Sequence, residues 1–179
     1  MILLTALFTA LIAAGTFIKI PMIPVSMTLQ TLFVFLTGLL LPPGHAFLSV
    51  LVFIILGLIG LPIFTSGGGI GALLSPTGGF ILGFAVAAFT GAMMARKNHG
   101  SFMYNILVCL VMEALTYLIG LPWLKIYLST SWAKALTVGL VPFLIGDAVK
   151  ILVAAGAAKA LYPEMMKLSV KLSEREKEE

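Results

Sequence analysis

The chain has 179 residues, of which 60% are hydrophobic and 10% are charged, and its formal net charge at pH 7 is +4. Soluble domains carry about 45–50% apolar and about 25% charged residues, so this composition excludes an ordinary soluble core and predicts one domain embedded in membrane lipid. The Lys and Arg residues lie between apolar runs and in the tail rather than in one basic patch with interleaved aromatics, which argues against nucleic-acid binding.

Six apolar stretches approach the roughly 17–25 residues that a helix needs to cross a bilayer. In chain order they cover residues 1–18, 28–41, 46–61, 78–95, 102–120 and 142–162. We therefore predict an all-α integral membrane protein of about six transmembrane helices. Residues 1–162 form a single domain in this prediction, and residues 163–179 form a charged, solvated tail with frayed ends.

The connections between these stretches predict an orientation. Tight polar turns occupy residues 42–45 and 96–100, whereas longer connections occupy 19–27, 62–77 and 121–141, the last with a short interfacial helix over 135–140. Lys and Arg are more frequent on the side of the tight turns and the tail, and that side is expected to be cytoplasmic. Both termini are then cytoplasmic in a multi-pass protein of the plasma membrane.

Ionisable residues within membrane spans are costly, which makes them candidates for function. Asp147 and Lys150 stand three positions apart and share one helix face. Such a pair suits a small ligand with a carboxylate at one end and amide-like N–H groups elsewhere, Lys150 holding the carboxylate and Asp147 accepting from N–H. A structural ion pair within one helix fits the spacing equally well.

Glu113 lies at a membrane depth similar to that of Lys150, so an ion pair between them is geometrically possible. The alternative is that Glu113 packs against Thr116 or a backbone group. Tyr117 follows Glu113 by four positions and shares its helix face. It is expected to line the same cavity, although a buried structural tyrosine explains it equally well.

The segment from Thr65 to Gly71 contains Gly67, Gly68 and Gly69 on the expected outer side. Consecutive glycines permit backbone conformations that other residues resist. The segment is predicted to close over a ligand or to offer it backbone N–H groups, with a bare flexible connection as the alternative. It lacks the Lys-Ser or Lys-Thr that a nucleotide-binding loop requires.

The sequence does not predict an enzyme. His45 and His99 fall in cytoplasmic turns and have no Cys, Asp or Glu at ligand spacing, so neither a metal site nor a catalytic triad is expected. No cofactor and no ATP-binding motif are indicated either. Energised transport by this chain would need other subunits.

Small residues recur every fourth position on two predicted helices, where they permit close helix approach in lipid. Those over residues 79–95 are expected to pack inside the bundle. Ala6, Ala10 and Ala14 lie on the first helix. This alanine stripe is predicted to be a subunit interface, with packing inside the bundle as the alternative.

Four segments together resemble the BioY family: PVSMTLQTL (24–32), GLIGLPIF (57–64) with the glycine-rich loop after it, SPTGGF (75–80) and PFLIGDAVK (142–150). The resemblance implies the substrate-binding component of an energy-coupling-factor biotin transporter, with six helices and biotin near the outer face. It implies that Asp147 and Lys150 contact biotin, that the glycine-rich loop covers the site, and that Ala6, Ala10 and Ala14 meet a coupling transmembrane subunit. Separate ATPase subunits would hydrolyse ATP.

Some relatives have an Asn in this loop and an Arg just after the Gly-Gly-aromatic turn, where the present chain has Gly68 or Gly69 and Ile81. The ligand contacts of that Asn and that Arg are therefore not expected in the present chain. The remaining alternatives are a stand-alone small-solute carrier and a binding component for another vitamin.

Overall fold

The computed structural model describes residues 1–97 and 101–178, which form a helical bundle with one short hairpin. In chain order the elements are α1 (Ile2–Phe17), β1 (Lys19–Ile20), β2 (Met27–Thr28), α2 (Gln30–Leu40), α3 (Pro43–Leu58), α4 (Ile70–Leu73), α5 (Gly78–Ala95), α6 (Phe102–Tyr127), α7 (Trp132–Gly139) and α8 (Leu144–Glu178). Helices therefore form at all six predicted positions.

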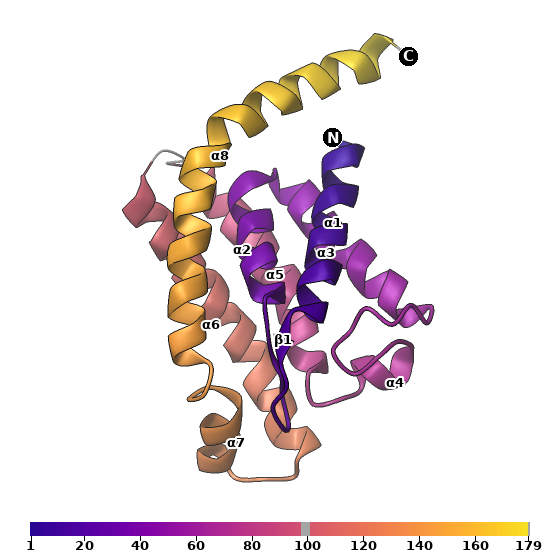
Figure 1. The fold of residues 1–179 in the computed structure, drawn as a ribbon, viewed down its shortest axis with the longest axis vertical. Coiled ribbons are helices and arrows are strands. Elements are labelled where there is room, and N and C mark those ends of the chain that lie inside the picture. Colours follow the sequence, from indigo (N-terminus) through magenta and orange to yellow (C-terminus); the bar gives the residue numbers. More distant parts are fainter. Residues whose placement is uncertain (98–100, 179) are drawn as a thin grey trace.

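The long helices run side by side, and the connections gather at the two ends of the bundle (Figure 1). The start of α1 and the second half of α8 lie at one end, while α7 and the antiparallel hairpin β1–β2 lie at the other. Helix α5 packs against α6, α2 and α3, and α8 packs against α2 and α6. The bundle thus places the starts of α2 and α8 near the hairpin end.

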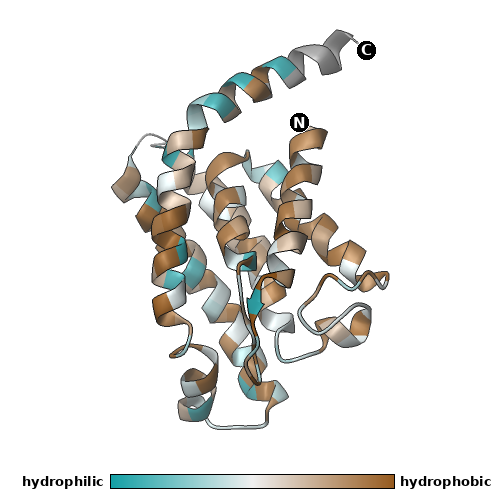
Figure 2. Ribbon diagram, viewed as in Figure 1, coloured by the Kyte–Doolittle hydropathy of each residue, from teal (hydrophilic) through white to brown (hydrophobic). Residues whose placement is uncertain are grey.

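The long helices consist largely of apolar residues, as the brown ribbons of Figure 2 show, and many of these residues are exposed. Five such residues, on five different helices, are between 39% and 69% exposed: Leu7, Ile55, Leu82, Leu118 and Leu152. Soluble monomers rarely expose large apolar patches, whereas lipid tails are as apolar as these side chains. The surface therefore fits a bilayer environment.

Two helices, α5 with 18 residues and α6 with 26, are long and apolar enough to cross a membrane by themselves. Helices α7 and α8 meet that criterion as one bent pair with an angle of 51°. Helices α1, α2 and α3 are apolar but shorter, with 16, 11 and 16 residues. Helices α1 and α2 are thus shorter than the stretches predicted for them, whereas α3 has the predicted length and begins three residues earlier.

Helix α6 extends seven residues beyond the predicted end at Gly120 and contains Pro122. Proline removes one helical hydrogen bond, but the next residues are anchored by tertiary contacts. The Trp123 indole N–H donates to the carbonyl of Ser75 at 2.9 Å, and Leu124 is fully buried. These contacts stabilise the turns that the Gly and Pro signals predicted to be loop.

Helix α8 begins at Leu144, not at the predicted Pro142, because residues 141–143 form a turn. It also continues past residue 162 through the segment that was expected to fray. An ion pair at 2.8 Å joins Lys167 to Glu164 one turn away, the spacing that supports exposed helices. Residues 98–100, including His99 in the predicted turn, lie outside the described residues, as does Glu179.

Helix α7 starts three residues before the predicted 135–140 segment because Ser131 caps it. The Ser131 hydroxyl accepts a hydrogen bond from the backbone N–H of Lys134 at 3.3 Å. Serine is a favoured N-cap residue for this reason.

The two small-residue stripes have different surroundings. Gly79, Gly83 and Gly91 of α5 are buried, and a Cβ on Gly83 would lie 3.1 Å from the Cα of Thr116 in α6. The expected internal packing of this stripe is confirmed. On α1, by contrast, the alanine stripe at positions 6, 10 and 14 is exposed, and the opposite face is buried. The alternative that this stripe packs inside the bundle is wrong.

Candidate ligand-binding site

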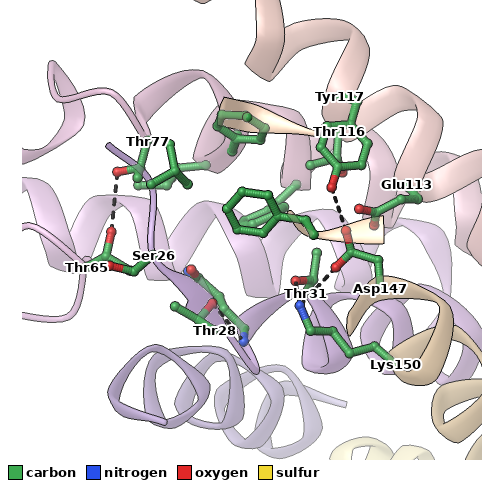
Figure 3. A pocket seen from close by; sticks show the side chains of 17 residues that line it. Ser26, Thr28, Thr31, Thr65, Thr77, Glu113, Thr116, Tyr117, Asp147 and Lys150 are labelled. Carbon is green, nitrogen blue, oxygen red and sulfur yellow. Dashed lines mark hydrogen bonds and ion pairs between the residues drawn. The ribbon is translucent and has the colours of Figure 1, made fainter. Parts of the chain in front are cut away.

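A pocket lies near the hairpin end of the bundle, between α2, α5, α6 and α8. Figure 3 shows two groups of polar side chains facing it from opposite sides. The carboxyl-bearing side combines Glu113 and Tyr117 of α6 with Asp147 and Lys150 of α8 and Thr31 of α2. The hydroxyl-bearing side consists of Ser26, Thr28, Thr65 and Thr77.

Asp147 and Lys150 form the buried ion pair of this pocket. The Lys150 Nζ lies 3.0 Å from Oδ1 of Asp147, and the two residues are 6% and 5% exposed. Nζ also donates to the Thr31 hydroxyl at 3.2 Å, and the Tyr117 hydroxyl donates to the second Asp147 oxygen, Oδ2. Buried charges are tolerated when they are paired and hydrogen-bonded in this way. The spacing on α8 therefore produces the adjacent anion and cation that the sequence predicted.

Glu113 lines the pocket, but the ion pair with Lys150 that the sequence left open as a possibility is not the one that forms. Among the described residues, Lys150 pairs with Asp147 and not with Glu113. Figure 3 shows the Glu113 carboxyl group beside that of Asp147. The three-residue spacing within α8 puts a carboxylate oxygen of Asp147 3.0 Å from the Lys150 ammonium group.

Gly67, Gly68 and Gly69 are not among the residues that line this pocket. Gly67 and Gly69 have φ angles of +112° and +84°, which favour glycine. The N–H of Gly69 donates to the carbonyl of Gly57 at 2.7 Å, which ties the loop to the end of α3. The loop reaches the pocket through Thr65, whose hydroxyl bonds that of Thr77 at 3.4 Å. The glycines thus shape the loop from outside the pocket.

Apolar side chains form the wall between the two polar sides. They are Val25, Phe80, Ile81, Phe84 and Phe143. The Phe80 ring packs edge-on against Tyr117 with centroids 6.0 Å apart, which fixes both rings. Because apolar walls with a few placed polar groups are typical of small-molecule sites, the pocket suits a compact ligand with an apolar middle and polar ends.

Several lining residues were not identified from the sequence, because they are uncharged. Gln30 and Thr31 begin α2, Thr28 ends the hairpin, and Thr116 lies between the two predicted residues of α6. The available signal was the cluster of polar residues from Thr28 to Thr31 at the edge of an apolar stretch. A search limited to ionisable residues overlooks it.

Comparison with known proteins agrees with this geometry. Residues 1–167 match the sequence profile of the BioY family. The chain is 38% identical over 185 residues to a probable biotin transporter BioY of Lysinibacillus sphaericus, covering 99% of this chain and 94% of that protein. It is 39% identical over 150 residues to the biotin transporter BioY of Thermotoga maritima, covering 83% and 88% of the two chains.

The fold is similar to a crystal structure of the S-component for biotin from an ECF-type ABC transporter. The TM-score is 0.80 at 29% sequence identity, and the match covers 89% of each chain.

Proposed function

We infer that this chain, which belongs to the BioY family, binds biotin as the substrate-binding component of an energy-coupling-factor transporter. It is a multi-pass protein of the prokaryotic plasma membrane, and its family is one of transporter components rather than of enzymes. Biotin is accordingly its transported ligand and not a cofactor.

The buried Asp147–Lys150 pair at an apolar pocket is the observation that best supports this function. Biotin joins an apolar thioether ring to a ureido group and to a flexible chain that ends in a carboxylate. The ureido group has two N–H donors and one carbonyl acceptor. A pocket with an apolar wall between two polar sides matches this distribution of polarity.

We propose that Asp147, Lys150, Tyr117 and Glu113 contact biotin. Gly67, Gly68 and Gly69 act indirectly, by holding the loop that carries Thr65. Asp147 and Lys150 lie 3.0 Å apart, so they address the same end of an extended biotin molecule. The sequence analysis assigned the carboxylate to Lys150 and the N–H groups at other positions of the ligand to Asp147. We now propose instead that both residues contact the same polar end.

Transport by this chain requires energy-coupling partners, which we propose to be a coupling transmembrane subunit and ATPase subunits. The exposed alanine stripe of α1 is the proposed contact with the coupling subunit. Its small side chains let another helix approach closely in lipid. The pocket then faces outward, and the end that carries both termini faces the cytoplasm.

The ligand assignment is tested by titrating the purified, detergent-solubilised chain with biotin, thiamin and riboflavin. Saturable calorimetric binding of biotin, with no binding of the other two vitamins, is expected. Tighter binding of thiamin or riboflavin would identify a component for another vitamin. Reconstitution with and without partner subunits then distinguishes the subunit from a stand-alone carrier, because only the latter transports alone.

A further inference from the structure

A second cavity lies at the opposite end of the bundle from the ligand pocket. It has a volume of about 300 Å³ and shares no described lining residue with that pocket. Its walls come from the start of α1, the turn between α2 and α3, the end of α5 and the second half of α8. Figure 1 shows this second half turning across the end of the bundle that carries the N-terminus. Pro163 lies inside α8, and proline in a helix interior favours such a kink.

The lining of this cavity is largely apolar. Leu4, Leu40 and Met165 are among its apolar residues, and Tyr162 adds a hydroxyl. Arg96, which directly follows α5, is the one charged side chain among the described lining residues, and it is exposed. Within the described part of the chain, Arg96 forms no ion pair. Because an unfilled apolar hollow forgoes dispersion contacts, a hollow with one cation suits an anion that carries an apolar chain.

The second half of α8 has the pattern of a helix that lies in a membrane interface. Met165 and Met166 line the cavity, and Leu168, one turn beyond Met165, is 40% exposed. Lys167 and Lys171 lie four positions apart, on a different face, and are exposed. An interfacial helix directs its apolar face toward acyl chains and its lysines toward headgroups.

The surroundings of the cavity connect it to lipid. Between the lining residues Met1 and Leu4, α1 presents Ile2 and Leu3, which are 76% and 66% exposed. In the proposed orientation this end of the bundle lies at the cytoplasmic leaflet, whose anionic lipids attract Lys and Arg close to the surface. An acyl chain can therefore enter the cavity from the surrounding lipid while its phosphate stays at Arg96.

We propose that this cavity binds an anionic phospholipid of the cytoplasmic leaflet. The Arg96 guanidinium donates hydrogen bonds to the phosphate, and one acyl chain packs against Leu4, Leu40 and Met165. The bound lipid thereby connects the second half of α8 to the start of α1 and to the turn between α2 and α3. This inference rests on the proposed function only for the orientation of the chain in the membrane.

The test is the affinity of the purified full chain for phosphatidylglycerol, measured by native mass spectrometry beside that for phosphatidylcholine with the same acyl chains. Both lipids carry a phosphate, but phosphatidylcholine also carries a compensating positive charge. Arg96→Gln removes the cation from the cavity, and Arg96→Lys keeps it. Lys97→Gln is the matched control, because Lys97 is the next residue and is exposed, but is not among the described residues that line the cavity.

The wild type should prefer phosphatidylglycerol. Arg96→Gln should lower the affinity for this lipid about tenfold, the low end of the range for a hydrogen bond to a charged group, and should remove the preference. Arg96→Lys should lose less, and Lys97→Gln should stay within about twofold of wild type. Biotin affinity should be unchanged in all three variants, because the ligand pocket lies at the other end of the bundle.

The acyl-chain contact is tested with Met166→Trp, which adds an indole to the wall of the cavity. Leu168→Trp is the control, because Leu168 lies on the same part of α8 and is exposed, but is not among the described lining residues. Met166→Trp should lower the affinity for phosphatidylglycerol about fivefold by occupying the space of the chain, and Leu168→Trp should not. Glycerol 3-phosphate, which has the phosphate without acyl chains, should not displace the lipid.

Three results would overturn the inference. Equal losses in Arg96→Gln and Lys97→Gln would show a diffuse attraction to basic residues, and displacement by glycerol 3-phosphate would show a site for a free anion. Unchanged lipid affinity in Met166→Trp, together with loss of co-purification with the coupling subunit, would identify a protein partner as the occupant. Failure of the wild type to bind biotin, with the lipid results as expected, would instead refute the proposed function.

Discussion

The Tyr117 hydroxyl donates a hydrogen bond to Oδ2 of Asp147, and this bond connects α6 to α8 at the pocket. On the other side of the ion pair, Lys150 donates to Thr31 and so connects α8 to α2. The proposed ligand contacts are therefore held by three helices at once. A change in any of these bonds is expected to affect both the ligand and the packing of α8.

Tyr117→Phe removes the bond to Asp147 and keeps the ring that packs on Phe80. We expect biotin affinity to fall about 2- to 10-fold and the free energy of unfolding to drop by about 0.5–1.5 kcal/mol. Tyr104→Phe is the matched control, because the Tyr104 hydroxyl bonds the Met94 carbonyl at 3.1 Å away from the pocket. An equal loss of biotin affinity in both variants would show that Tyr117 acts through stability alone.

Ala10→Trp tests the alanine stripe of α1 as a subunit interface. Ala10 is exposed, so the indole should extend into lipid without overpacking the core. Biotin binding by the isolated chain should stay within about twofold of wild type. Co-purification with the coupling subunit should fall sharply, because the bulky ring prevents close approach.

Ala10→Trp should be compared with Leu118→Trp, which changes an exposed residue on another helix, α6. Equal retention of the coupling subunit by both variants would contradict the proposed interface.

Gly83→Ala tests the close contact between α5 and α6. The added Cβ would lie 3.1 Å from both the Cα and the carbonyl oxygen of Thr116, and backbone atoms of a packed helix cannot easily move away. We expect the free energy of unfolding to fall by about 1–3 kcal/mol. Gly156→Ala in α8 is the control, because its Cβ would meet the Phe102 ring at an ordinary 3.8 Å. A thermal scan in which both variants melt like wild type would contradict the packing account.

Gly68→Ala tests whether the loop shapes the pocket indirectly. Its Cβ would lie 2.5 Å from the carbonyl oxygens of Gly60 and Leu61, so the loop that carries Thr65 must shift. Biotin affinity should therefore decrease several-fold, roughly the loss of one hydrogen bond. Gly71→Ala in the same region meets nothing within 4 Å and should bind normally. Equal biotin affinity in the two variants would show that the conformation of the loop does not affect biotin binding.

The sequence predicted the helices well because apolar run length is a strong signal in lipid, where backbone groups must be satisfied within the helix. It placed Asp147 and Lys150 correctly because a three-residue spacing determines their shared face. The end of α6 could not be predicted, since the contact of Trp123 with Ser75 depends on tertiary structure.

Gln30 was overlooked for a different reason. It is uncharged, and its burial at the pocket depends on how α2 packs, which spacing along the chain does not reveal. The ion-pair partner of Lys150 was open for a similar reason. The sequence does not reveal whether Asp147 of the same helix or Glu113 of α6 lies nearer to its ammonium group. Both are questions of side-chain geometry between helices.

Biotin binding beside the Asp147–Lys150 pair is tested most directly by the calorimetric affinity of Lys150→Ala for biotin, measured beside that of the wild type. The Lys150 ammonium is buried and supplies a charged hydrogen-bond donor to the pocket. Its removal should raise the dissociation constant roughly 10- to 100-fold, with the variant still folded by thermal unfolding. A folded Lys150→Ala protein that binds biotin as tightly as wild type would contradict the account and place the ligand elsewhere.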